Sequence, residues 1–233
     1  MTSPHFEPLL AKITGRQARI GVIGLGYVGL PLAMAAARAG FRVLGFDVDP
    51  DKISAIEARQ SYIEAVPSDV LAAECAAGRF AATCDFARLS ECDVIAICVP
   101  TPLTRHRDPD LSFVTRTSQD IAASLRAGQL IVLESTTYPG TTDEVVRPIL
   151  EAGGQTAGQD FFLGFSPERE DPGNRDFHTS SIPKVIGADN AQSLDLLKAF
   201  YGAVVTTVVP VSSAATAEAV KLTENIFRAV NIA

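Results

Sequence analysis

The chain has 233 residues, a formal net charge of −7 and 47% hydrophobic residues, which is ordinary for one large globular domain or one domain with part of a second. The negative charge argues against nucleic acid as the main partner, because phosphate binding requires clustered Lys and Arg. The richest apolar run, residues 30–37, is too short to span a membrane and no secretory signal is recognisable, so we expect a cytoplasmic protein without a membrane partner.

The predicted elements begin with a leader, residues 1–17, in which residues 8–13 form a short helix. From residue 18 to 210 apolar runs alternate with helical patterns, and most of the runs are continuous, as in parallel sheets covered on both faces. This predicts an α/β fold: a doubly wound, mainly parallel Rossmann-type sheet with helices on both faces. The predicted strands are residues 19–23, 42–46, 94–99, 129–134, 161–164, 184–187 and 204–209. The predicted helices are residues 29–39, 51–59, 68–77, 113–125, 142–151 and 191–201.

Residues 211–233 form the last predicted element. Pro210 closes a strand, and Ser212 or Ser213 can cap a new helix. The helical pattern then runs to Ala233 without a C-terminal Gly or Pro. We expect the start of a long helix that leads to a central domain absent from this chain.

A glycine-rich turn follows the first predicted strand. The motif Gly24-x-Gly26-x-x-Gly29 is weak evidence alone, but strand, turn, helix, second strand and acid follow in the order of a dinucleotide-binding unit. The first glycine permits the tight turn, the second lets a pyrophosphate approach the backbone, and the third allows close helix packing. The alternative is a similar turn in an unrelated α/β protein.

An acid ends the second predicted strand. Asp47 stands 18 residues after Gly29, where a carboxylate accepts both ribose hydroxyls of NAD and repels the 2′-phosphate of NADP. The sequence therefore predicts NAD as the cofactor. Lys52 can reach the adenosine side of this site, although a lone helical Lys can equally be solvated.

Two further loops leave the carboxyl ends of predicted strands. One contains Val99, Pro100 and Thr101, and the other contains Ser135 and Thr136. Short hydroxyl side chains at this edge of a sheet can hold a cofactor or a water molecule. The alternative is an ordinary turn built from Pro, Gly and Ser or Thr.

The cysteines predict neither a metal site nor a nucleophile. Cys75, Cys84, Cys92 and Cys98 are separated by 9, 8 and 6 residues, spacings that match no zinc or redox motif. Cys98 stands in a strand that looks buried and has no basic neighbour in sequence. A structural thiol is therefore favoured over a reactive one.

A cation and an amide share one face of the last helix. Lys221 and Asn225 are four residues apart, so both can donate to a developing oxyanion. The alternative is a solvated polar stripe with Glu218, Glu224 and Arg228.

Five segments in order resemble the UDP-glucose/GDP-mannose dehydrogenase family: residues 20–33, 98–102, 134–141, 165–173 and 221–233. The family oxidises C6 of a nucleotide sugar from alcohol through aldehyde to acid and reduces two NAD. Residues 166–187 are most similar to the branch acting on UDP-N-acetylhexosamines. The resemblance implies a UDP-sugar substrate, with UDP-N-acetylglucosamine first and its manno epimer next.

The resemblance also implies roles for individual residues. Thr136 and Glu168 match residues that position water and handle protons near C6, while Lys221 and Asn225 match the pair that stabilises charge on the C6 oxygen. Some relatives carry a second acid where this chain has Pro172. The predicted cofactor site consists of Gly24, Gly26, Tyr27, Val28, Gly29, Asp47, Lys52, Val99, Pro100, Thr101, Ser135 and Thr136.

In the family, a catalytic Cys lies in the central domain, and none of the four cysteines here matches it. We therefore expect this chain alone to be inactive, and the full-length protein to be a homo-oligomer that assembles through its central helical region. Two alternatives are a non-catalytic NAD-binding module and a β-hydroxyacid dehydrogenase, which lacks the pattern of residues 166–173. A hydroxyacyl-CoA dehydrogenase would need a His–Glu pair, and His5, His106 and His178 all stand in predicted loops.

Overall fold

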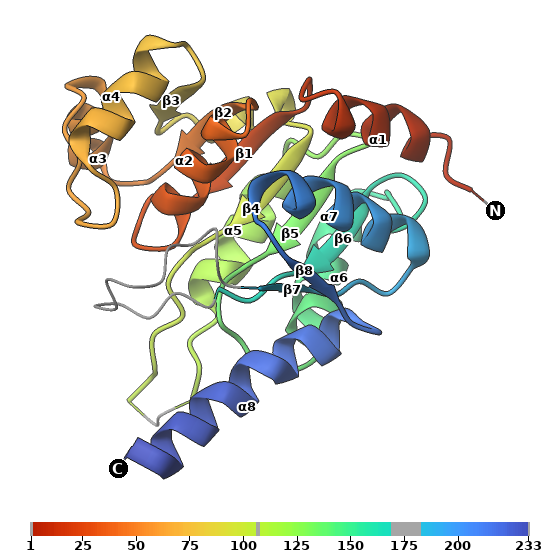
Figure 1. Ribbon diagram of the computed structural model, residues 1–233. Coiled ribbons are helices and arrows are strands. Elements are labelled where there is room, and N and C mark those ends of the chain that lie inside the picture. The colour runs from red at the N-terminus through yellow and green to blue at the C-terminus, as the bar shows by residue number, and fades with distance from the viewer. Residues whose placement is uncertain (1, 106–107, 169–182, 233) are drawn as a thin grey trace.

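The computed structural model describes residues 2–105, 108–168 and 183–232 (Figure 1). Its main sheet has six parallel strands in the order β3-β2-β1-β4-β5-β6, and a small sheet pairs β7 with β8. The predicted doubly wound α/β fold is therefore confirmed, with the strand order of a Rossmann fold. The strands are β1 Arg19–Ile23, β2 Arg42–Phe46, β3 Phe80–Thr83, β4 Val94–Ile97, β5 Leu130–Leu133, β6 Phe162–Phe165, β7 Lys184–Ile186 and β8 Val208–Pro210.

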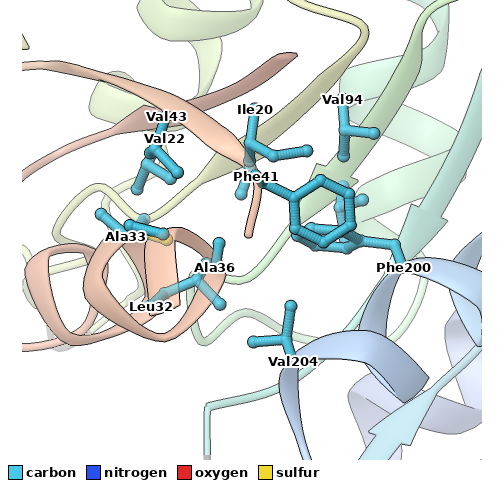
Figure 2. Close-up of a cluster of buried hydrophobic side chains, with 14 of the residues drawn as sticks. Ile20, Val22, Leu32, Ala33, Ala36, Phe41, Val43, Val94, Phe200 and Val204 are labelled. Carbon is cyan, nitrogen blue, oxygen red and sulfur yellow. The ribbon is translucent and has the colours of Figure 1, made fainter. Parts of the chain in front are cut away.

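Helices cover both faces of the main sheet. The α-helices are α1 Phe6–Thr14, α2 Gly29–Arg38, α3 Pro50–Glu57, α4 Ser68–Ala76, α5 Ser112–Ala122, α6 Arg147–Glu151, α7 Ala191–Val204 and α8 Ala214–Ile232. One core, part of which is drawn in Figure 2, packs α1, α2 and α7 against the sheet. A second core packs α5, α6 and the start of α8 on the other face. Alternate strand residues enter the two cores, which explains why the strands are continuously apolar.

Two predicted strands are wrong in part, and one strand of the structure was missed. Strand β3 was not predicted, because Phe80–Thr83 is a short edge strand that pairs only with β2 and keeps three of its four residues partly exposed. The strand predicted from residue 204 begins later, because α7 continues through Val204, whose side chain packs into the core. Residues 184–186 do not extend the main sheet but pair with β8, joined to β6 by one antiparallel bridge between Phe165 and Gly187.

The helix predicted over residues 142–151 is irregular at its start. A π turn, η2 (Thr142–Val146), precedes α6. Pro148 cannot donate to the carbonyl of Glu144, and in a regular helix its ring would clash with that carbonyl. The wider turn removes this clash.

The last helix starts where the sequence predicts a cap. The hydroxyl of Ser213 accepts the backbone N–H of Thr216 at 3.1 Å, so Ser213 is the capping residue. The first turns of α8 pack on the domain, and its later turns project away from the sheet (Figure 1). Within the described ranges, no helix has both the length and the apolar character needed to cross a membrane.

Candidate cofactor and active site

The predicted site residues lie on loops that leave the carboxyl ends of neighbouring strands. Residues 24–28 follow β1, Asp47 follows β2, residues 98–102 follow β4 and residues 134–140 follow β5. Strands β1 and β4 are paired although the chain visits β2 and β3 between them. In open α/β sheets, ligands bind outside the carboxyl ends of the strands at such a reversal of strand order.

The three glycines of the turn have different constraints. Gly24 has φ +89°, and a Cβ there would lie 2.5 Å from the carbonyl oxygen of Cys98. A Cβ on Gly29 would overlap the carbonyl oxygen of Gly24. By contrast, a Cβ on Gly26 would meet no described atom within 4 Å. The fold therefore requires Gly24 and Gly29, whereas Gly26 leaves space that a pyrophosphate can use.

The start of α2 also suits an anion. Val28 stands at the N-cap and has no side-chain oxygen with which to cap the helix. Its neighbour Tyr27 is 71% exposed at the tip of the turn. The first N–H groups of α2 and the positive end of its dipole are therefore directed toward a ligand above the turn, an arrangement that fits the pyrophosphate of NAD.

Asp47 connects the turn with the second strand. Its carboxylate is buried and accepts the N–H groups of Leu25 at 2.8 Å and Asp49 at 3.1 Å. Lys52 donates to the same carboxylate at 2.9 Å, so the interpretation of Lys52 as a simply solvated side chain is wrong. The acid predicted to bind ribose is thus fixed beside the glycine turn.

Tyr62 is a member of this network that the sequence motifs did not identify. It lies in the loop between α3 and α4, and its hydroxyl donates to the carbonyl oxygen of Leu25 at 2.8 Å. Burial, followed by the charges of Asp47 and Asp49, raises the pKa of Tyr62 well above its ordinary value. The hydroxyl therefore keeps its proton and acts as a donor. No periodicity or spacing links Tyr62 to a turn 37 residues away.

The loops after β4 and β5 are tied together by their hydroxyl groups. Thr101 donates to the backbone carbonyl of Thr136 at 2.7 Å, and Ser135 donates to that of Val99 at 2.7 Å. Ser135 is buried, whereas Pro100 and Thr136 are exposed. Ser135 therefore holds the two loops in place, while Thr136 is accessible to a ligand.

A buried charge cluster lies behind these loops. Lys184 Nζ is 2.7 Å from Glu134 Oε2 and 3.2 Å from Glu168 Oε2, and the hydroxyl of Tyr201 donates to the other oxygen of Glu134. The side chains of Glu134, Lys184 and Glu168 are only 0%, 7% and 12% exposed. Glu168 is therefore largely buried and is not a surface acid. The rest of its loop, with Arg169, Pro172 and Gly173, lies outside the described residues, as do His106 and His178.

The cluster fixes the charge of its lysine. Burial alone would lower the pKa of Lys184, but Glu134 and Glu168 raise it above its ordinary value. Burial raises the pKa of Glu134, and Lys184 opposes that rise. Burial, and then the charge of Glu134, also raises the pKa of Cys98 well above its ordinary value. Cys98 is 8% exposed and its thiol stays protonated, which supports the predicted structural role.

Helix α8 is joined to the site by a buried acid. Glu218 is fully buried and accepts the N–H groups of Gly140 at 2.6 Å and Thr142 at 2.9 Å, together with the hydroxyl of Thr142. Lys221, one turn later, is 9% exposed, and Asn225 is exposed. The alternative of a solvated polar stripe is therefore wrong for Glu218 and Lys221, which are buried. Asn225 is exposed to solvent.

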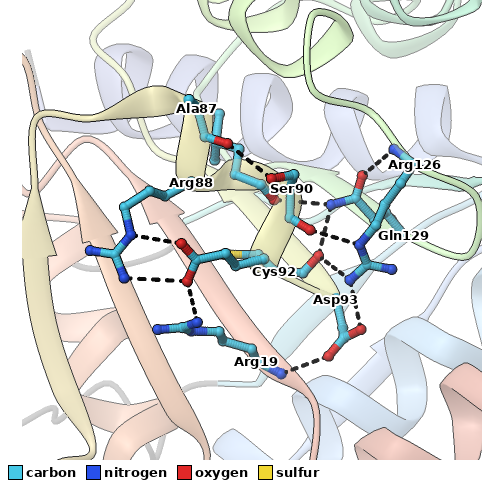
Figure 3. Close-up of polar contacts among 10 residues, drawn as sticks. Arg19, Ala87, Arg88, Ser90, Cys92, Asp93, Arg126 and Gln129 are labelled. Carbon is cyan, nitrogen blue, oxygen red and sulfur yellow. Dashed lines mark hydrogen bonds and ion pairs between the residues drawn. The ribbon is translucent and has the colours of Figure 1, made fainter.

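The amino-terminal edge of the sheet has a polar network with a different role (Figure 3). Asp93 accepts the backbone N–H of Arg19 and the side chains of Lys12 and Arg126, at 2.8–2.9 Å. Burial alone would raise its pKa, but these three donors hold the pKa of Asp93 below its ordinary value. They bring together the starts of β1 and β4 and the loop before β5, so this network fixes the strands in place.

Comparison with known proteins assigns the chain. Residues 18–205 match the NAD binding domain of the UDP-glucose/GDP-mannose dehydrogenase family. The UDP-N-acetyl-D-glucosamine 6-dehydrogenase of Pseudomonas aeruginosa is 37% identical over 94% of the chain and 51% of its own length. The UDP-N-acetyl-D-mannosamine dehydrogenase of Pyrococcus horikoshii is 36% identical over 92% of the chain and 51% of its own length.

A solved structure agrees with these relatives. The NDP-N-acetyl-D-galactosaminuronic acid dehydrogenase of Methanosarcina mazei superposes with a TM-score of 0.88 at 34% identity, over 98% of this chain and 50% of that one. The chain thus spans about half the length of the relatives it matches. The predicted cofactor, NAD, is confirmed by the matched domain, and the chain belongs to the UDP-glucose/GDP-mannose dehydrogenase family.

Proposed function

We propose that this chain is the NAD-binding part of a nucleotide-sugar 6-dehydrogenase, which oxidises the C6 alcohol of a UDP-sugar to the uronic acid with two NAD. The observation that carries this proposal is the similarity to UDP-N-acetylhexosamine dehydrogenases along almost the entire chain. We propose UDP-N-acetylglucosamine as the first candidate substrate and its manno epimer as the second; the identities of 37% to the glucosamine enzyme and 36% to the mannosamine enzyme support both.

We propose that different parts of the site bind different parts of NAD. Residues 24–29 bind the pyrophosphate, Asp47 and Lys52 hold the adenosine ribose, and the loops of Val99–Thr101 and Ser135–Thr136 border the nicotinamide end. When bound, NAD supplies the acceptor for the hydride removed from C6. The surrounding protein residues then orient the sugar and handle its protons.

The proposed catalytic groups lie toward the β5–β6 end. Glu168, whose carboxylate pairs with Lys184 at 3.2 Å, accepts a proton near C6, and the hydroxyl of the exposed residue Thr136 positions water. Lys221 and Asn225 stabilise negative charge on the C6 oxygen, and loss of one such donor typically raises the barrier by about 2.7–4 kcal/mol. Lys221 is brought to this end of the sheet because Glu218 anchors α8 to the segment after β5.

We further propose an organisation for the protein to which these residues belong. Residues 1–17 form a leader, residues 18–210 the NAD-binding domain, and residues 211–233 the start of a helix leading to a central domain. We propose that the thiol that carries the oxidised intermediate belongs to that central domain, because none of the four cysteines of this chain stands in a motif that matches the family's catalytic Cys. The complete protein is proposed to be a cytoplasmic homo-oligomer.

The test compares these 233 residues with a full-length protein. Both are titrated with NAD and assayed for NADH formation with UDP-N-acetylglucosamine, UDP-N-acetylmannosamine and UDP-glucose. We expect both to bind NAD, and only the full-length protein to oxidise a UDP-sugar, forming two NADH per sugar. A full-length protein that binds NAD yet oxidises no UDP-sugar would overturn the proposal.

A further inference from the structure

Leu25, at the centre of the glycine turn, is held from three directions. Its N–H donates to Asp47 at 2.8 Å, and its carbonyl oxygen accepts from the Tyr62 hydroxyl at 2.8 Å. Its side chain is fully buried and lies against Gly45, where an added Cβ would come within 2.8 Å of it. The contact with Asp47 belongs to the expected dinucleotide site, whereas the contact with Tyr62 is outside that motif.

We propose that Tyr62 is a positioning residue of the cofactor site, whose hydroxyl fixes the peptide between Leu25 and Gly26 in the orientation that receives pyrophosphate. In a planar trans peptide, the carbonyl oxygen and the following N–H point in opposite directions. A Leu25 carbonyl held by Tyr62 therefore turns the N–H of Gly26 away from Tyr62. This inference rests on NAD binding at the turn.

The opposite orientation of this peptide would impair phosphate binding. A rotated peptide would present the carbonyl oxygen, which carries partial negative charge, where the N–H of Gly26 otherwise lies. Gly26 can undergo such a rotation more easily than other residues, because glycine has wide backbone freedom. The Tyr62 hydroxyl opposes this rotation, because the rotated peptide would lose the hydrogen bond that its Leu25 carbonyl accepts from Tyr62.

Tyr62 is well placed to act without contacting the phosphates. The residue is 36% exposed, so removal of its hydroxyl leaves no large cavity in the core. Tyr62→Phe is therefore expected to fold. The apparent dissociation constant of a ligand rises in proportion as the binding-competent conformation becomes less populated.

The experiment measures binding by titration calorimetry, using this chain and three ligands: NAD, ADP-ribose and adenosine. For Tyr62→Phe, we expect the dissociation constants of NAD and ADP-ribose to rise roughly three- to tenfold, the range of one net hydrogen bond. The value for adenosine, which lacks the pyrophosphate, should stay unchanged. Tyr138→Phe removes the hydroxyl of a tyrosine with similar exposure, 38%, and should leave ADP-ribose binding unchanged.

Three outcomes would overturn this inference. In the first, Tyr62→Phe lowers the melting temperature but binds ADP-ribose like the wild type, which assigns the hydroxyl a purely structural role. In the second, adenosine binding weakens as much as ADP-ribose binding, which means direct contact with the nucleoside. In the third, the wild-type chain binds neither NAD nor ADP-ribose, which would overturn the proposed function as well.

Discussion

The two ends of the carboxyl edge of the sheet are built in opposite ways. At the β1–β2 end, residues 24–29 form one continuous turn, and Asp47 reaches it from 22 residues away. At the β5–β6 end, Glu134, Lys184 and Tyr201 meet across 50 and 67 residues of sequence. The first end leaves open space at Gly26, whereas the second encloses its charges almost completely.

This difference indicates that the glycine turn is a binding surface, whereas the buried charge cluster stabilises the fold. Backbone N–H groups at the glycine turn can bind an anion without burying any charge of their own. The cluster at the other end buries three charged side chains, and such groups are tolerated only when they satisfy one another. We therefore expect a mutation of Gly26 to change cofactor affinity, and mutations of Glu134 or Lys184 to change stability.

Replacing Lys184 by Met is expected to have the largest effect. Glu134 would be left fully buried without its cation, and loss of one partner of a buried ion pair costs about 3–5 kcal/mol. Urea denaturation at neutral pH measures the change in the free energy of unfolding. The loss of unfolding free energy should become smaller as pH falls. Burial raises the pKa of Glu134, so this acid is protonated more readily, and the protonated acid needs no cation.

A matched control for this variant is Lys198→Met. The Lys198 side chain is 45% exposed in its ion pair with Asp195, and such surface pairs contribute at most about 1 kcal/mol. Equally small losses in the two variants would contradict the buried charge cluster.

The next test separates two glycines of the turn. Gly26→Ala should leave the melting temperature unchanged, because its Cβ meets no described atom within 4 Å. It should nevertheless weaken NAD binding about tenfold or more, equivalent to about 1.4 kcal/mol, because the methyl group occupies the approach of the pyrophosphate. Gly29→Ala should lower both the melting temperature and the affinity, because its Cβ overlaps the Gly24 carbonyl. Unchanged NAD affinity in Gly26→Ala would place the pyrophosphate elsewhere.

The smallest expected effect is a pH dependence near the start of α8. Burial and the neighbouring Asp189 raise the pKa of Asp143 to about 6. The native state therefore binds this proton more tightly than the unfolded state, and stability falls as pH rises from about 4 to about 6. The change should be about 1 kcal/mol or less, because the side chain is partly exposed and pairs with Arg147. Melting curves of Asp143→Asn should lack this slope, and an unchanged slope would assign it to another group.

The sequence predicts the β1–β2 end far better than the β5–β6 end. Strand β1, the glycine turn, α2 and Asp47 follow one another along the chain, so spacing alone indicates where they meet. Lys184 looks like an ordinary strand residue, and nothing in its spacing predicts that it meets Glu134 and Glu168. Tyr62 is missed for the same reason, because tertiary folding brings its loop to the turn.

Errors in predicted elements also have local causes. Val204 and Val205 are β-branched and resemble a strand, yet α7 runs through Val204 because its packing against the core outweighs local preference. Strand β3 lies at the sheet edge, and its sequence Phe-Ala-Ala-Thr lacks the continuous run of large apolar residues that marks the buried strands.

A crystal structure of this chain with NAD tests the central claim most directly. The pyrophosphate should lie against the N–H groups of residues 24–29, beside the open space at Gly26, with the adenosine ribose on Asp47. A nucleotide bound elsewhere, or an empty turn in crystals saturated with NAD, would contradict the assignment of this edge of the sheet as the cofactor site.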